Sequence, residues 1–320
     1  MIDKHGREIT YLRVSVTDRC NLRCVYCMSE DGVSKKAHTG ILRNEEILQI
    51  VSEAVKLGIR KVRITGGEPL VRKGIVDLVG AIASLDGMEE VAMTTNGLLL
   101  PDYIHDLKKA GLKRLNISLD SLNPERFKEI TRSGALDKVL EGIEKALELG
   151  MKPVKLNTVL IGGFNDDEIE DFVKLTEQKA IDVRFIELMP IGEASDWAKE
   201  RFIPNSTILE TVPELNAVDR LDPSSPATYY KLPNSVGRVG LISPISCQFC
   251  GSCNRMRLTA DGKLKPCLHS EDEIDLLDIV RLHPEQVSSK IIEAIERKPE
   301  EHLLEEENIV NNRNMNQIGG

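Results

Sequence analysis

Polar and apolar residues alternate along six short segments of the first 190 residues, and segments with a helical spacing of apolar residues lie between them. The predicted strands are Tyr11–Thr17, Lys61–Thr65, Val91–Asn96, Arg114–Asp120, Pro153–Leu160 and Asp182–Leu188. The predicted helices are Asn44–Leu57, Ile75–Ser84, Asp102–Ala110, Asp137–Leu149 and Asp166–Gln178. This regular alternation predicts a parallel sheet or barrel, and six units are fewer than the eight of a closed barrel.

One face of each predicted strand is polar. Residues two apart on a strand share a face, so Leu12 and Val14 lie opposite Arg13 and Ser15. The polar faces of the other strands carry Lys61, Arg63 and Thr65; Thr94 and Asn96; Asn116, Ser118 and Asp120; and Lys155 and Asn157. Parallel strands are usually covered on both faces, and a covered polar face is costly unless it holds water or a polar ligand. We therefore expect these faces to line a ligand-filled interior; a sheet with one solvated face is the alternative.

The alternation of strands and helices stops after Pro190-Ile191-Gly192. Short strands are predicted around Thr228–Leu232 and Val236–Ile242, and helices around Glu273–Leu282 and Pro284–Arg297. We therefore divide the chain into a barrel-like part, residues 1–192, and a C-terminal part, residues 193–320.

Composition narrows the function classes. The chain has 320 residues, 41% of them hydrophobic and 29% charged, which is typical of a globular protein. The formal net charge of −9 disfavours broad electrostatic binding to nucleic acid or to an anionic membrane. No apolar run reaches the roughly 18 residues of a membrane span, and the first ten residues lack the apolar core of a signal peptide. We expect a cytoplasmic enzyme without nucleic-acid or membrane partners.

The seven cysteines form two groups. They are Cys20, Cys24 and Cys27, then Cys247, Cys250, Cys253 and Cys267. In a reducing compartment such close spacing indicates metal binding or catalysis rather than disulfides. Three cysteines in one loop can bind three irons of a 4Fe–4S cluster and leave the fourth iron open. A structural zinc site is the alternative, but zinc prefers four ligands and the first loop offers three.

The first group and a glycine motif together resemble the radical S-adenosylmethionine (SAM) superfamily. Cys20, Cys24 and Cys27 have the superfamily's spacing with Tyr26 before the last cysteine, and Gly66-Gly67-Glu68-Pro69 follows the second strand. The resemblance implies a 4Fe–4S cluster on these cysteines and SAM as a cofactor. It also implies a partial (β/α)6 TIM-like barrel, whose open side is covered by a C-terminal region with a second Fe–S cluster.

The second group repeats the three-cysteine pattern in Cys250, Cys253 and Cys267. Cys247 or His269 could supply a fourth ligand. We expect Cys247 not to be a ligand, because the family resemblance described below uses the other three cysteines.

A strand is predicted directly after Cys253, and it places Arg255 and Arg257 on one face. Two guanidinium groups side by side suit a phosphate or a carboxylate. An exposed pair without a ligand is the alternative, and the neighbouring cluster favours the functional interpretation.

The whole chain resembles the GTP 3′,8-cyclase family of molybdenum cofactor biosynthesis. The resemblance rests on the first cysteine loop, Arg63-Ile64-Thr65-Gly66-Gly67-Glu68-Pro69, Thr94-Thr95-Asn96-Gly97, Asn116-Ile117-Ser118-Leu119-Asp120, Arg184-Phe185-Ile186-Glu187, the Cys-x-x-Cys-Asn-Arg-x-Arg run and the terminal Gly319-Gly320. It implies SAM contacts from Tyr26, Gly67, Ser118 and Met189. It implies GTP contacts from Arg13, Arg63, Thr94, Lys155, Arg255, Met256 and Arg257. It gives a catalytic role to Arg255, Arg257, Gly319 and Gly320, and a second 4Fe–4S cluster to Cys250, Cys253 and Cys267.

The resemblance also implies the reaction. Reductive cleavage of SAM gives a 5′-deoxyadenosyl radical that takes hydrogen from C3′ of GTP, and C3′ then bonds to C8 of guanine. The implied product is (8S)-3′,8-cyclo-7,8-dihydroguanosine 5′-triphosphate. We further expect an electron donor such as flavodoxin or ferredoxin, a homodimer, and insertion of the Gly319-Gly320 tail into the barrel near Arg13. A frayed tail is the alternative.

Three other functions remain open from the sequence. A peptide-modifying radical SAM enzyme usually has more cysteines near its C-terminus and no need for inward arginines. A radical SAM enzyme that matures haem or another cofactor would share the first loop only. The third is a non-enzymatic zinc-binding module.

Overall fold

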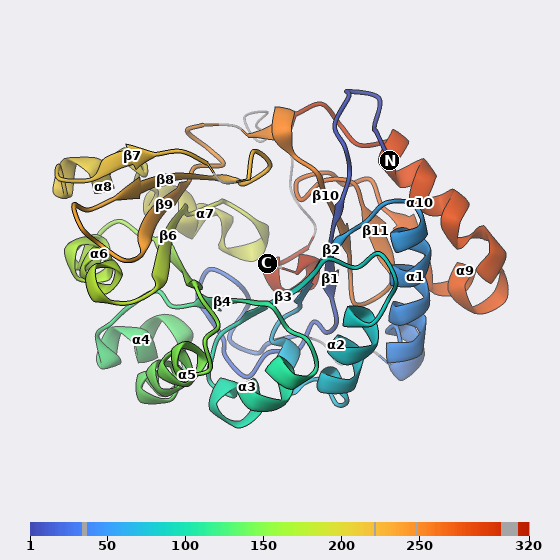
Figure 1. Cartoon of the computed structure of the whole chain (residues 1–320), viewed down its shortest axis with the longest axis horizontal. Coiled ribbons are helices and arrows are strands. Elements are labelled where there is room, and N and C mark those ends of the chain that lie inside the picture. Colours follow the sequence, from blue (N-terminus) through green and yellow to red (C-terminus); the bar gives the residue numbers. More distant parts are fainter. Residues whose placement is uncertain (34–36, 221, 248, 302–312, 320) are drawn as a thin grey trace.

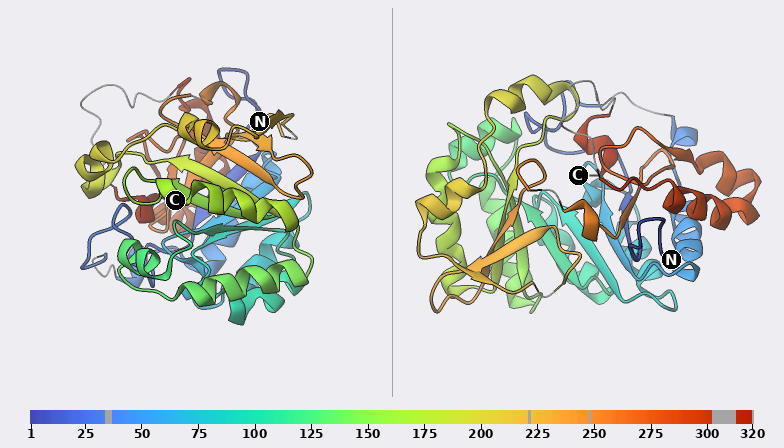
Figure 2. Two further views of the ribbon diagram at one scale, coloured as in Figure 1. Left: turned by 90° about the vertical axis from the view of Figure 1, so that its left-hand side faces the viewer. Right: turned by 90° about the horizontal axis from the view of Figure 1, so that it is seen from above.

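The computed structural model describes residues 1–33, 37–220, 222–247, 249–301 and 313–319. Twelve strands within these residues form one sheet in the order β12-β11-β10-β1-β2-β3-β4-β5-β6-β9-β8-β7. The sheet is open, since β12 and β7 lie at its two edges. It curves around a concave side, and the C-terminal end of the chain lies on that side (Figures 1 and 2).

Six parallel strands form the middle of the sheet, as the sequence predicts. They are β1 (Tyr11–Ser15), β2 (Lys61–Thr65), β3 (Glu90–Thr95), β4 (Arg114–Ser118), β5 (Val154–Leu160) and β6 (Ile181–Glu187). The helices between them are α1 (Asn44–Lys56), α2 (Ile75–Ala83), α3 (Leu100–Lys109), α4 (Pro124–Thr131), α5 (Leu136–Glu148) and α6 (Ile169–Gln178). These helices follow the outer, convex side of the sheet in Figure 1.

The C-terminal part of the chain extends both edges of this sheet. At one edge β10 (Arg255–Leu258) pairs in parallel with β1, and β11 (Lys263–Lys265) and β12 (Ile274–Asp275) follow antiparallel. At the other edge β9 (Arg238–Ile242) pairs in parallel with β6, and β8 (Ala227–Lys231) and β7 (Asn216–Val218) follow antiparallel. The partial barrel with a C-terminal addition is therefore confirmed, while the division at residue 192 stays a prediction. The remaining helices are α7 (Ser195–Glu200), α8 (Ser206–Thr211), α9 (Leu277–Leu282), α10 (Val287–Glu296) and α11 (Met315–Ile318).

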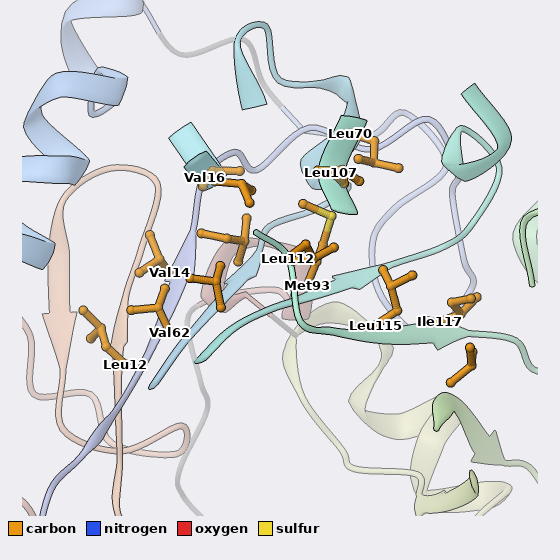
Figure 3. Packing of buried hydrophobic residues seen from close by; sticks show 14 of the residues in the cluster. Leu12, Val14, Val16, Val62, Leu70, Met93, Leu107, Leu112, Leu115 and Ile117 are labelled. Atoms are coloured by element: carbon orange, nitrogen blue, oxygen red, sulfur yellow. The ribbon is translucent and has the colours of Figure 1, made fainter. Parts of the chain in front are cut away.

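The hydrophobic core lies between the outer face of the sheet and the helices. Leu12, Val14 and Val62 are buried there beside Met93 and Leu115 of the next strands (Figure 3). The period-2 pattern thus puts the apolar face of each central strand against the helices and leaves the polar face for the concave side. No helix among the described residues is both long and apolar enough to cross a bilayer.

One predicted helix is wrong in its first part. In the range Glu273–Leu282, Ile274 and Asp275 form β12, and α9 begins only at Leu277. The Asp275 carboxylate forms an ion pair with Lys263 of β11, and its Oδ1 accepts a hydrogen bond from Leu277 N at 2.9 Å. Pairing with a distant strand therefore overrides the local helical pattern. The sequence reading also passed over α4, a short helix whose first amide groups are capped by Asn123.

Candidate active site

A cavity of about 630 Å³ contains residues from both cysteine groups. All six central strands contribute side chains to it, among them Arg13 of β1, Arg63 of β2 and Lys155 of β5. The polar faces of the strands therefore line an interior space, as the sequence predicts. This volume is typical of a small-molecule site.

The first cysteine loop follows β1 and places Cys20, Cys24 and Cys27 at the cavity wall. Cys20 Sγ accepts a hydrogen bond from Leu22 N at 3.3 Å, and Asn96 Nδ2 lies 3.6 Å away as a second donor. Burial, together with the other thiols, raises the pKa of Cys24 well above its ordinary value and that of Cys27 to about 12. A bound metal cation would offset that cost by stabilising the thiolates.

The glycine motif packs against this loop. A β-carbon at Gly67 would collide with the carbonyl oxygen of Arg19, so glycine is required here by the close approach of two backbone segments. Gly67 N donates to Thr17 O at 2.7 Å. The buried Glu68 carboxylate accepts from Asn96 N at 2.7 Å and from Leu70 N at 3.0 Å. Glu68 thus connects the loops that follow β2 and β3, and its burial raises its pKa to about 7.

The residues expected to contact SAM lie in the same cavity. Tyr26, Gly67, Ser118 and Met189 all line it. Tyr26 Oη donates to Asp120 Oδ2 at 2.6 Å, which fixes the ring beside the cysteine loop. Met189 has the wrong alternation to share the inward face of β6, and the structure places it beyond the end of that strand at Glu187. All four residues therefore share one cavity, and their roles in SAM binding stay a prediction.

The second cysteine group lines another part of the cavity. Cys250, Cys253 and Cys267 are half-buried there, whereas Cys247 is exposed and is not among the lining residues. His269 is buried and lines the cavity. Burial opposes ionisation of Cys253, but the nearby cations Arg255 and Lys298 outweigh it and lower the pKa of this thiol to about 6. This loop is electropositive, in contrast to the first one.

Basic side chains outnumber carboxylates around the cavity. The lysines and arginines that line it are Arg13, Lys61, Arg63, Lys113, Arg114, Lys152, Lys155, Arg184, Arg238, Arg255, Arg257 and Lys298, and the carboxylates are Glu90, Asp120, Glu187 and Asp222. Burial and neighbouring arginines lower the pKa of Lys155 to about 7 and that of Arg257 to about 10. In a chain of net charge −9, this local excess indicates an anionic ligand.

Thr94 and Met256, two of the expected substrate contacts, face opposite sides of the sheet. Thr94 lines the cavity, and its Oγ1 is buried without a hydrogen-bond partner in the described part of the chain, so it is available to a ligand. Met256 faces the other way: its side chain is buried in the hydrophobic core, because it alternates with Arg255 and Arg257 along β10. A contact from Met256 to a ligand would have to use its main chain.

The C-terminal tail enters the concave side of the sheet. Ile318 is buried, and Arg257 Nη1 donates to Gly319 O at 2.8 Å. Gly319 has φ +76°, and a β-carbon there would meet Thr65 Oγ1 at 2.5 Å and Ser15 Cβ at 3.0 Å. Insertion is therefore observed as far as Gly319. Gly320 lies outside the described residues.

Comparisons with known proteins agree with this geometry. Residues 14–176 match the family model of the radical SAM superfamily, and residues 181–304 match that of Molybdenum Cofactor Synthesis C. A curated protein of Alkaliphilus oremlandii (strain OhILAs), named GTP 3′,8-cyclase, is 60% identical over 321 residues and covers 100% of both chains. A protein of the same name from Peptoclostridium acidaminophilum is 56% identical, over 100% of this chain and 98% of its own.

The chain belongs to the GTP 3′,8-cyclase family of the radical SAM superfamily.

Among solved structures, Streptococcus suis SuiB resembles this member of the family in fold, with a TM-score of 0.60 and 15% identity. The match covers 89% of this chain and 67% of SuiB. SuiB bound to S-adenosylmethionine gives a TM-score of 0.55 at 16% identity, over 90% of this chain and 69% of the other. At this identity the likeness concerns the fold alone.

As a radical SAM enzyme of this family, the chain uses SAM and iron–sulfur clusters, and the donor sets fit them. Each triad brings three cysteines to one cavity. Among the described ranges no three His, Cys, Asp or Glu side chains gather closely enough to hold a single metal ion. A 4Fe–4S cluster does not need such a group, because each cysteine binds a different iron.

Sequence reasoning missed several residues of this cyclase-family site. Arg184 was noted only as part of a motif, yet it lines the cavity and its Nη2 donates to Asn116 Oδ1 at 2.6 Å. Its alternation along β6 could have indicated this. Tyr229 of β8 lies against Lys155, and Lys298 lies beside the second cysteine group. Neither has a local signal, because each comes from an element whose position depends on distant contacts.

Proposed function

We propose that the chain is a GTP 3′,8-cyclase that uses SAM and two 4Fe–4S clusters. The observation that carries the proposal is the shared cavity, which joins two cysteine triads to a basic wall. A radical reaction on a nucleoside triphosphate needs both features in one space. The full-length identity of 60% to a protein named GTP 3′,8-cyclase supports GTP as the substrate.

When bound, the first cluster and SAM supply a 5′-deoxyadenosyl radical that takes hydrogen from C3′ of GTP. Cys20, Cys24 and Cys27 would hold that cluster at the end of β1. Tyr26, fixed by Asp120, and Ser118 would orient SAM against it. Glu68 keeps the surrounding loops in place through its hydrogen bonds to main-chain amides.

The basic residues would bind the triphosphate. Arg13 of β1 lies between Arg63 of β2 and Arg257 of β10 in the register of the sheet. Lys155 of β5 and Arg255 of β10 line the same cavity. Their mutual repulsion is relieved when an anion enters, so part of the binding energy comes from charge neutralisation. The same contacts would hold the ribose and base still for bond formation between C3′ and C8.

The second triad would hold the other cluster beside the guanine. That cluster would supply a binding point for the base, and the inserted tail at Gly319 would restrict the access of water to the concave side. We expect a cytoplasmic enzyme that receives electrons from a donor such as flavodoxin or ferredoxin. A homodimer is a further expectation, which light scattering of the purified chain would test.

The decisive test is anaerobic turnover of the reconstituted chain with SAM, dithionite and GTP. We expect 5′-deoxyadenosine, methionine and a product that has the mass of GTP but is cyclised between C3′ and C8. GTP deuterated at C3′ should transfer its label to 5′-deoxyadenosine. SAM cleavage without any transfer from GTP would reject GTP as the substrate and favour a different radical SAM activity.

A further inference from the structure

A buried lysine lies next to the second cysteine group and belongs to none of the motifs. Lys298 follows α10 directly after Arg297, and 2% of its surface is exposed. Its Nζ donates to Arg255 O at 2.8 Å and to Pro266 O at 2.7 Å. These carbonyls belong to the segments that carry Cys253 and Cys267. The lysine therefore connects, through these two hydrogen bonds, the segment at the start of β10 and the segment that follows β11.

Its charge has no carboxylate partner among the described residues. Burying an ammonium group is costly unless an opposite charge lies close by. Burial lowers the pKa of Lys298, Arg7 and Arg255 lower it further, and the thiolates of Cys253 and Cys267 raise it. The only anions that favour its charged form in this set are thus two of the proposed cluster ligands.

Two neighbouring buried cations show the usual solution. Lys265, 1% exposed, lies two residues before Cys267 and pairs with Glu273 at 3.0 Å. Arg7 donates to Cys250 O at 3.0 Å and to Pro299 O at 2.6 Å, and it is paired with Asp3 at 2.7 Å. Both are neutralised by their own carboxylates. Of these three cations, Lys298 alone has no carboxylate partner within the described ranges, and it lies beside the cluster loop.

We propose that Lys298 is a positioning residue for the second cluster. Its hydrogen bonds to the two carbonyls hold the cysteine-bearing segments in place, and its buried positive charge partly offsets the negative charge of the cluster. The inference rests on the proposed second cluster. Three thiolates and a 4Fe–4S core carry a net negative charge that increases by one when the core takes up one electron. A nearby cation therefore favours the reduced form, and its loss makes the cluster harder to reduce.

The test compares full-length, reconstituted chains with Lys298→Met, Lys298→Gln, Lys298→Arg and, as the matched buried control, Lys265→Met. Iron content and dithionite titration followed by electron paramagnetic resonance report the second cluster, whose signal is assigned in a Cys24→Ala background. In the two neutral variants we expect the ratio of reduced to oxidised second cluster at a fixed potential to fall about tenfold. For a one-electron couple this is a shift of about 59 mV to lower potential. Lys298→Arg and Lys265→Met should stay within about a factor of two of the parent.

The results for these variants either support or reject the role of Lys298. If a neutral variant binds the second cluster with an unchanged potential, or if Lys298→Arg shifts as far as Lys298→Met, the inference is wrong. If neither neutral variant binds the cluster, loading of Lys298→Arg supports the inference and failure of that variant rejects it. Absence of a second cluster in the parent chain would instead contradict the proposed function, so the two failures are distinguishable.

Discussion

Lys155 shows how a single side chain responds to the charge of the cavity. Its Nζ lies 3.4 Å from Tyr229 Oη and 4.0 Å from an oxygen of Asp182. Burial lowers its pKa most, Arg184 lowers it further, and together they bring it to about 7, against an ordinary value of 10.5. This lysine therefore loses its proton near neutral pH when no anion lies beside it.

A prediction for GTP binding follows from this pKa. Below pH 7 Lys155 is already charged, whereas above pH 7 it must take up a proton when the triphosphate binds. The dissociation constant of GTP should then rise about fivefold between pH 7 and pH 8. In Lys155→Arg the side chain stays charged, and the rise should be less than about threefold. Equilibrium dialysis with labelled GTP measures both, and the ionisation of GTP itself is common to the two proteins. Identical pH profiles would show that Lys155 does not contact the phosphates.

Alternation along a strand was the main basis for predicting which side chains face the cavity. It correctly placed Arg13 and Arg63 on the inner face, because the side chains of a strand alternate by geometry alone. The family resemblance assigned a ligand contact to Met256, although alternation along β10 turns that side chain into the core. Lys298 could not be found this way, since its burial depends on strands that lie far away in the sequence.

The C-terminal helix α11 shows how a short element can reach a functional site. An N-terminal cap by Asn314 and Gln317 fixes its first turn, and Asn316 Nδ2 donates to Asp18 O at 3.0 Å near the first cysteine loop. Gly319 ends it in a left-handed conformation against Ser15. Only glycine avoids both the strained φ and the clash at this point.

Substitution of Gly319 should therefore displace the tail. In Gly319→Ala the β-carbon would contact Thr65 Oγ1, and the bond to Arg257 should be lost. We expect both clusters and the fold to persist, while cyclised product falls at least about tenfold. Gly163→Ala is the matched control, because Gly163 has a similar φ of +70° but open space around it. Product is quantified by mass analysis after anaerobic turnover.

A deletion tests the same element from the other side. The chain without Gly319 and Gly320 should form much less cyclised product. A synthetic peptide ending in Gln317-Ile318-Gly319-Gly320 should restore part of that product, since tethering changes the effective concentration of the tail and not its contacts. Full activity of Gly319→Ala and of the truncated chain would mean that the inserted tail has no part in the reaction.

Elements were predicted where local pattern decides them. All six central strands and most helices between them follow from apolar periodicity, which burial against one sheet imposes. The edges of the sheet were harder. That β9 and β10 join β6 and β1 in parallel depends on long connections, and the helix expected from Glu273 gives way to β12 because Ile274 pairs with Leu264.

At the scale of the molecule, one open sheet brings both cysteine triads to a single cavity. The first triad follows β1. The second lies at one end of the antiparallel pair β10 and β11, with Cys250 and Cys253 before β10 and Cys267 after β11. Each triad has its own electrostatic setting, with Asp120 near the first and Arg255 and Lys298 near the second. The two sites should therefore assemble independently, although they serve one substrate.

This independence can be tested with single cysteine variants. Cys24→Ala should lose about half of the bound iron and all SAM cleavage, because three thiolates are needed to hold a cluster with one open iron. Its affinity for GTP should stay within about threefold of the parent, since the basic wall and the second cluster remain. Cys253→Ala should also lose about half of the iron, yet it should still cleave SAM slowly and should bind GTP at least about tenfold more weakly.

Cys247→Ala is the control, because that thiol is exposed and outside the cavity, and it should retain all the iron. Iron assay, 5′-deoxyadenosine release and equilibrium dialysis give the three readouts. SAM cleavage by Cys24→Ala at the parent rate would refute the role of the first triad. Loss of all iron in either Cys24→Ala or Cys253→Ala would show that the two clusters assemble as one unit, and a loss of iron in Cys247→Ala would make that cysteine a fourth ligand. We expect independent assembly, because the two loops are anchored at separate strands and each uses its own three cysteines.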